Sequence, residues 1–156
     1  MTDVSKSLLD GDHAGLGHAG LISALVHTAR GAQTVLALSS HDARCNALRQ
    51  TAAMIRDRRD DILQRNAADV ARAKANGISA AFIDRLTLTP SRIDGMAKGL
   101  EDITGLEDPI GRELARWTRP NGLDISRVAT PLGVIGVIYE SRPNVTVDAG
   151  GLCLIA

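Results

Sequence analysis

Aromatic residues are almost absent from this sequence, whose 156 residues include one Phe, one Trp and one Tyr. Proteins that bind single-stranded nucleic acid stack bases on aromatic side chains, so this scarcity argues against such a role. An excess of charge is also missing, because 18 basic residues balance 18 acidic ones. Nucleic acid and anionic membranes generally attract proteins with a basic surplus. We therefore expect neither nucleic acid nor membrane among the partners.

Long hydrophobic runs are missing as well. No apolar stretch approaches the roughly 20 residues that a membrane-spanning helix needs, and residues 1–10 lack the basic and then apolar order of a secretion signal. The cytoplasm is therefore the expected location. The length and the apolar content of 44% are typical of a single globular domain with a modest core.

Cysteine and histidine are too sparse and too scattered to suggest a site. Cys45 and Cys153 have no neighbouring Cys or clustered His, so neither a disulfide framework nor a metal site is predicted. We interpret both cysteines as small buried apolar residues and the four histidines as solvated or incidental. No Ser or Cys has a His and an acid near it in the sequence, so no catalytic nucleophile is visible.

Residues 1–20 are rich in Gly, Asp and Ser, and we expect a flexible tail there. Within them Gly15, Gly17 and Gly20 match the dinucleotide fingerprint G-x-G-x-x-G, and Asp42 lies at about the spacing of a ribose-binding acid. The fingerprint requires a buried strand directly before it, which the polar residues preceding Gly15 do not offer. We interpret the match as coincidental.

Residues 21–106 have the three- and four-residue apolar spacing of packed helices. Ser39 or Ser40 can cap a second helix, Asn76-Gly77 is a stop signal, and Thr89-Pro90 starts a later helix. A helical layer is the prediction for this part of the chain.

Residues 112–130 change in character. The segments 113–118 and 123–130 are candidate strands, and Arg119-Pro-Asn-Gly122 between them has the chemistry of a tight reversal. A β-hairpin is predicted. Residues 131–139, PLGVIGVIY, form a continuous apolar run, typical of a strand covered on both faces in a parallel α/β sheet.

A helix is expected after this strand, although Gly150-Gly151 weakens it by about 1–2 kcal/mol relative to alanines. A parallel sheet needs further strands beside the first. We therefore expect residues 131–156 to open a larger, truncated α/β domain whose remainder lies outside this sequence. The predicted fold class is α/β, with a helical layer, a hairpin arm and a first strand-helix unit.

The turn between that strand and helix is where open α/β sheets bind ligands, because free N–H groups and the positive end of the helix dipole gather there. Arg142 stands at this end. It either pairs with Glu140 or Asp148 as a structural bridge, or contacts an anionic ligand such as a phosphate. Asn144 is either a helix cap or a catalytic hydrogen-bond donor.

At these residues the sequence resembles the γ-glutamyl phosphate reductases, also called glutamate-5-semialdehyde dehydrogenases, of the aldehyde dehydrogenase superfamily. The stretches that carry the resemblance are residues 131–148 (PLGVIGVIYESRPNVTVD), residues 84–93 (DRLTLTPSRI), Asp108-Pro109 and residues 117–122 (WTRPNG). They occur in the family's order, and the resemblance covers about residues 21–155.

The resemblance implies NADPH-dependent reduction of L-glutamate 5-phosphate to the 5-semialdehyde and phosphate, a step of proline biosynthesis. It implies that a cysteine thiolate attacks the acyl phosphate, and that hydride from the nicotinamide follows. It further implies a Rossmann-like NADP-binding domain that residues 21–106 and 131–156 begin, and a homo-oligomer for which the hairpin is the assembly arm.

Carried over to this sequence, Tyr139, Glu140, Ser141 and Arg142 resemble the loop beside the nicotinamide end of the cofactor. Asn144 or Arg142 lies near the family's oxyanion-stabilising position. An anion at Arg142 has two sources, because the substrate and NADPH both carry phosphate.

Neither cysteine of this chain matches the family's nucleophile, so we expect the chain alone to be inactive. Two other interpretations remain open. One is a non-catalytic module that associates with a full-length reductase subunit or with itself, since unpaired strands and apolar faces attract partners. The other is a free-standing nucleotide binder built on Gly15 to Gly20.

Overall fold

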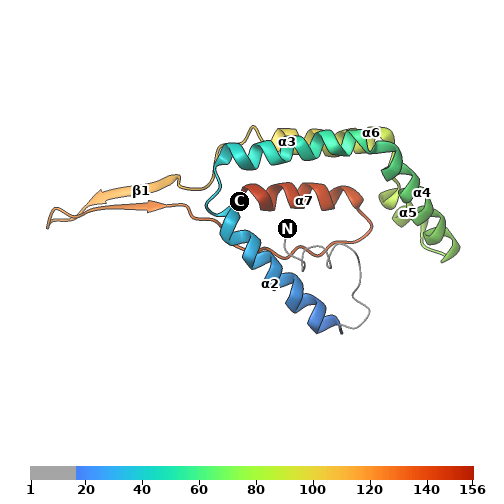
Figure 1. Cartoon of the computed structure of the whole chain (residues 1–156), viewed down its shortest axis with the longest axis horizontal. Helices are drawn as coiled ribbons and strands as arrows, with labels where there is room; N and C mark the ends of the chain where they lie inside the picture. Colours follow the sequence, from blue (N-terminus) through green and yellow to red (C-terminus); the bar gives the residue numbers. More distant parts are fainter. Residues whose placement is uncertain (1–16) are drawn as a thin grey trace. The chain divides into compact units, whose positions relative to one another are not determined.

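The structure, a computed structural model, describes residues 17–156 (Figure 1). It contains α2 (His18–Leu36), α3 (His41–Asp57), α4 (Arg59–Ala75), α5 (Ala80–Leu86), α6 (Pro90–Ile103), β1 (Glu113–Thr118), β2 (Asp124–Val128) and α7 (Pro143–Ile155). Residues 1–16, with most of the predicted tail and Gly15 of the fingerprint, lie outside the described residues. None of the described helices is long and apolar enough to cross a membrane.

The chain divides into two compact units. In the described residues, the first unit comprises residues 17–39 together with Pro131–Gly136, and the second comprises Ser40–Thr130 together with Val137–Ala156. Helix α2 of the first unit begins at His18, so residues 18–20 are helical and the predicted tail is wrong there. The second unit contains the core, the cleft beside α7 and the polar cluster around Asp108.

Helix α3 begins where the sequence predicted a cap. The Ser40 Oγ accepts a hydrogen bond from the Ala43 N–H at 3.2 Å, which satisfies one of the open donors of the first turn. Cys45, Leu48 and Ala52 then follow at spacings of three and four, and all three are buried. The apolar face predicted for this helix is confirmed.

The core lies among α3, α6 and α7. Its buried members are Cys45, Leu48, Ala52, Ala97, Leu100 and Ile155. Helix α6 begins at Pro90 after the Thr89 cap, as predicted, and Ile93, Ala97 and Leu100 line its inner face. Burying a Leu or Ile side chain of this kind stabilises the fold by about 2 kcal/mol.

Helix α7 contains the Gly150-Gly151 pair that weakens it in isolation. Gly151 is buried, and a Cβ at that position would lie 2.7 Å from the Leu100 Cδ2 atom. The missing side chain therefore lets α7 approach α6 more closely than an alanine would. This close packing against α6 explains how α7 is held in place despite its poor intrinsic helix propensity.

The predicted hairpin is confirmed. Strands β1 and β2 pair antiparallel, with Trp117 opposite Ile125 and an irregularity between Glu113 and Ala115. The reversal is closed by the Arg119 N–H, which donates to the Leu123 carbonyl at 2.8 Å. Gly122 adopts φ of 84°, the left-handed conformation that glycine adopts without a steric cost.

The strand predicted at residues 131–139 is absent, because the described chain has no β-structure between β2 and α7. Its apolar side chains are exposed on both sides, with Leu132 at 73% and Ile138 at 102%. A strand exists only through hydrogen bonds to a neighbour, and the sole sheet in residues 17–156 is the β1–β2 pair. The fold that the structure shows is helical with one antiparallel hairpin.

Candidate functional site

The turn before α7 holds the only residue other than glycine with positive φ among the described residues. Ser141 has φ of 51°, a left-handed conformation that costs a residue with a Cβ free energy. Such strain is concentrated at functional sites, where surrounding contacts maintain it. It reverses the chain between the extended segment and the helix, so Ser141 and Arg142 lie at the start of α7.

Asn144 does not cap α7, so that interpretation is wrong. The helix begins at Pro143, with Arg142 in the capping position and no side chain bonded to the first turn. Proline favours the first helical position because its φ is already helical and its missing N–H would have no partner there. Asn144 thus lies inside the first turn, and its Nδ2 donates to the Asp148 Oδ2 at 3.2 Å.

Tyr139 is tied to the same helix. Its hydroxyl lies 2.6 Å from the Thr146 Oγ1, within hydrogen-bond distance. Tyr139 is 45% exposed, and residues 131–139 form no strand whose edge its ring could close. The side chain therefore presents an aromatic surface beside the first turns of α7.

Arg142 forms no structural bridge. Neither Glu140 nor Asp148 makes an ion pair with it, and its guanidinium has no hydrogen bond within residues 17–156. The side chain is exposed. The bridge interpretation made from the sequence is wrong, and the anion-binding interpretation stays a prediction.

A cleft of about 420 Å³ opens beside Arg142. Its walls are the end of α5, the first turns of α6 and the start of α7, all within the second unit. Three arginines and two aspartates line it, together with Asn144: Asp84, Arg85, Arg92, Arg142, Asn144 and Asp148. A cleft with both signs of charge suits a ligand that carries both signs.

Arg85 and Arg92 were missed as site residues in the sequence analysis. They lie fifty or more positions before Arg142, and only the fold brings them to the same cleft. The sequence did contain a signal, because both belong to the 84–93 stretch that carries the family resemblance. Arg92 is held by its Nη1, which donates to the Asp84 and Thr87 carbonyls at 2.6 and 2.5 Å.

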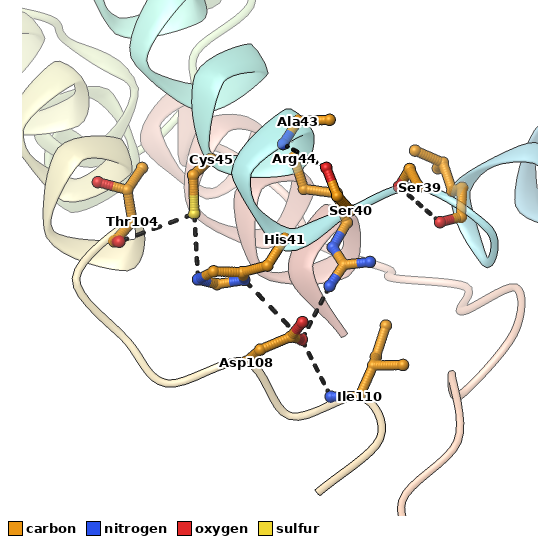
Figure 2. Close-up of polar contacts among 10 residues, drawn as sticks. Ser39, Ser40, His41, Ala43, Arg44, Cys45, Thr104, Asp108 and Ile110 are labelled. Carbon is orange, nitrogen blue, oxygen red and sulfur yellow. Dashed lines mark hydrogen bonds and ion pairs between the residues drawn. The ribbon is translucent and has the colours of Figure 1, made fainter.

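A second polar cluster contains a cysteine, a histidine and an acid (Figure 2). The Cys45 Sγ lies 3.4 Å from the His41 Nε2, and the His41 Nδ1 lies 3.8 Å from the Asp108 Oδ1. His41 is thus in a contact network, so the solvated interpretation does not hold for this histidine. Cys45 is buried at 2% exposure, as predicted, so its thiol is shielded from any substrate.

The network also fixes the loop before the hairpin. Figure 2 shows the Arg44 guanidinium and the Ile110 N–H converging on the Asp108 Oδ1, at 2.8 and 3.0 Å. The Arg44 contact joins α3 to a residue sixty-four positions later, and the Ile110 contact holds the loop locally. Among residues 17–156, no three His, Cys, Asp or Glu side chains are placed to hold a metal ion.

Two solved structures are similar to this chain in fold, and both are reductases. A structure from Thermotoga maritima matches with a TM-score of 0.80 and 41% identity, over 83% of this chain and 31% of that one. A structure from Saccharomyces cerevisiae matches with a TM-score of 0.80 and 28% identity, over 89% of this chain and 35% of that one. Both are γ-glutamyl phosphate reductases.

Curated relatives carry the same name. The γ-glutamyl phosphate reductase of Paramagnetospirillum magneticum is 55% identical over 134 residues, which are 86% of this chain and 32% of the relative. That of Beijerinckia indica is 56% identical over 136 residues, 87% of this chain and 32% of the relative. No family model matches the chain. The resemblance to these oxidoreductases is confirmed, and the chain spans about a third of their length.

Proposed function

We propose that this chain forms part of an NADPH-dependent reductase that converts L-glutamate 5-phosphate to L-glutamate 5-semialdehyde and phosphate in proline biosynthesis. The observation that carries the proposal is the 55% identity to a γ-glutamyl phosphate reductase over 134 residues. The aligned residues make up 86% of this chain. Because the chain spans about a third of its relatives, the activity of the whole proteins is a proposal for it.

NADPH supplies hydride when bound, and Tyr139 to Arg142 fit a group of that kind. The half-exposed Tyr139 offers an aromatic surface, Ser141 has the left-handed backbone conformation of the turn, and Arg142 offers an unpaired guanidinium. We propose that these residues, with the exposed Glu140, contact the cofactor. We also propose that the apolar segment before these residues, together with α7, begins a Rossmann-like domain.

Asn144 and Arg142 face the substrate in this proposal. The Asn144 amide has two N–H groups, of which one is used by Asp148, so the other can donate to a developing oxyanion. Arg142 contacts an anionic group of the substrate. Preorganised donors of this kind stabilise charge as it develops in the transition state.

Neither cysteine of the chain is placed to attack this substrate. Cys45 is buried between His41 and Thr104, with its Sγ 3.7 Å from the Thr104 carbonyl oxygen. Cys153 lies near the end of α7, about 14 Å along the helix from Asn144 at 1.5 Å per residue. The isolated 156-residue chain should therefore give no turnover.

Genetic complementation tests the proposal directly. The full open reading frame that encodes this chain is expressed in bacteria that lack their own γ-glutamyl phosphate reductase and need proline. The expected result is growth without proline. The purified protein should also catalyse the reverse reaction, in which the semialdehyde reduces NADP only when phosphate is present. A well-folded product that neither restores growth nor catalyses either direction would overturn the proposal.

Association is a second candidate function, favoured by the exposed apolar segment 131–139. Val134, Ile135 and Val137 are each more than 40% exposed, and unpaired extended segments add readily to the edges of sheets. The partner would be a full-length reductase subunit or a second copy, with the hairpin as an assembly arm. Sedimentation of the purified chain tests this: a homogeneous monomer that also fails to co-purify with a complete subunit excludes it.

A further inference from the structure

The cleft beside α7 contains two arginines that no acid neutralises. Arg85, at the end of α5, stacks over the Phe82 ring with its guanidinium carbon 4.7 Å from the ring centroid, and its Nε donates to the Ala81 carbonyl. Arg142, at the start of α7, has no partner within residues 17–156. Neither forms an ion pair with a carboxylate of the described chain. Both guanidiniums therefore retain N–H donors that can bind an anion.

The same cleft also contains an acid with an open oxygen. Asp148 is half-buried, and its Oδ2 accepts from Asn144, whereas its Oδ1 accepts no hydrogen bond within the described chain. Gly99 of α6 faces this oxygen, since a Cβ there would lie 3.5 Å away. A carboxylate confined between two helices favours a cationic ligand group, because such a group compensates the charge at short range.

The third arginine acts as a support. Arg92 binds the Asp84 and Thr87 carbonyls, and its Nη2 lies 3.4 Å from the Asp84 Oδ1. Its charge is thus already compensated within the wall of the cleft. These bonds fix the turn after α5 and so hold Arg85 in position.

We propose that this cleft binds the α-amino-acid end of the substrate, with its carboxylate on Arg85 and Arg142 and its ammonium on Asp148. The proposal rests on the proposed function, and it assigns to the cleft the substrate's amino-acid group and not its phosphate. A phosphate dianion would match the arginines but would be repelled by Asp148. An α-amino acid satisfies both signs of charge at once.

Methionine methyl resonances provide a test on the whole 156-residue chain that needs neither cofactor nor turnover. Met96 lines the cleft, whereas Met54 lies on α3 outside it with 53% exposure. Titration with L-glutamate should shift the Met96 methyl signal and leave that of Met54 in place. Glutarate, which lacks the ammonium group, should bind about tenfold more weakly, the effect of one charged hydrogen bond.

Substitutions separate the two parts of the site. Arg85→Gln and Arg142→Gln should each weaken both ligands about tenfold, because each removes a charge-assisted hydrogen bond. Asp148→Asn should weaken L-glutamate alone and abolish its advantage over glutarate. Arg49→Gln, an exposed change on α3 away from the cleft, is the matched control and should change neither affinity.

Three results would overturn the proposal. Equal affinity for glutarate and L-glutamate would remove the role of Asp148. A Met96 shift with inorganic phosphate but not with L-glutamate would make the cleft a phosphate site. The absence of any Met96 response in an enzyme whose reading frame restores growth without proline would reject the cleft and leave the proposed reaction standing.

Discussion

Arg44 and Asp108, sixty-four residues apart, form an ion pair that joins the first turn of α3 to the loop before β1. The Arg44 Nη2 lies 2.8 Å from the Asp108 Oδ1, and the arginine is only 2% exposed. Removing a guanidinium from water costs several kcal/mol unless a carboxylate compensates it. Asp108 supplies such a carboxylate to the buried Arg44.

Asp108→Ala should lower the free energy of unfolding by about 3 kcal/mol, since it leaves a buried charge without its carboxylate. Asp108→Asn keeps an oxygen that can accept from Arg44 and from the Ile110 N–H, so its loss should be clearly smaller. Urea denaturation of the three proteins measures both differences. Equal stabilities of Asp108→Ala and the wild type would show that water already solvates Arg44.

Alanine substitutions at the two neighbouring glycines of α7 should have opposite effects on stability. Gly151→Ala places a methyl group 2.7 Å from the Leu100 Cδ2 and 3.0 Å from the Ile103 Cδ1, and Leu100 is buried and has little room to move. Gly150→Ala meets nothing within 4 Å and should stabilise the helix by about 1 kcal/mol. Because overpacking in Gly151→Ala costs about 2 kcal/mol, the free energies of unfolding of the two variants should differ by at least that amount. Thermal or urea unfolding measures this difference. A stabilised Gly151→Ala variant would contradict the close packing of α7 on α6.

Local chemistry made much of this fold predictable. Ser40 and Thr89-Pro90 start helices because their side chains and fixed φ satisfy the first turn, and Asn76-Gly77 ends α4, with Gly77 at φ of 69°. The hairpin followed from Arg119-Pro-Asn-Gly122 in the same way. Each signal acts within a few residues, so a single sequence contains all of it.

The features that the sequence did not disclose depend on distant neighbours. Residues 131–139 have the composition of a buried strand, but composition supplies no hydrogen-bonding partner, and the structure leaves the segment unpaired. Arg85 meets Arg142 at one cleft only after α5, α6 and α7 have packed. The contact of His41 with Asp108 likewise depends on the fold and not on sequence spacing.

Asn66 should be a strong determinant of the connection after α5. It is buried at 7% exposure; its Nδ2 donates to the Leu86 carbonyl at 2.9 Å, and its Oδ1 accepts from the Leu88 N–H at 2.7 Å. Asn66→Ala should cost about 2 kcal/mol, because two backbone groups lose their partners. Hydrogen exchange at the Leu88 amide should accelerate in this variant more than exchange at the core amides of α6. Unchanged protection at Leu88 would show that water replaces the side chain.

Glu101 should have a pKa below the ordinary value of a glutamate. The pKa of this carboxyl is lowered mainly by the hydrogen bonds from Arg56, one of which runs from Nη2 to Oε2 at 2.9 Å, while partial desolvation opposes the shift. Because the folded pKa lies below the unfolded value, the ion pair contributes stability above the unfolded pKa, and this contribution is lost as the pH falls through the folded pKa. An NMR titration of the Glu101 carboxyl measures the shift.

Two variants separate the causes of that shift. Arg56→Gln should return the Glu101 pKa toward its ordinary value, whereas Lys98→Gln should raise it less, because Lys98 acts only through a weaker Coulomb interaction and is itself bonded to Asp102. Added salt should reduce the shift, since both partners are in contact with solvent. If Lys98→Gln moved the Glu101 pKa as far as Arg56→Gln, the general field of α6 would control this carboxyl, and the contact between α3 and α6 would have no specific electrostatic role.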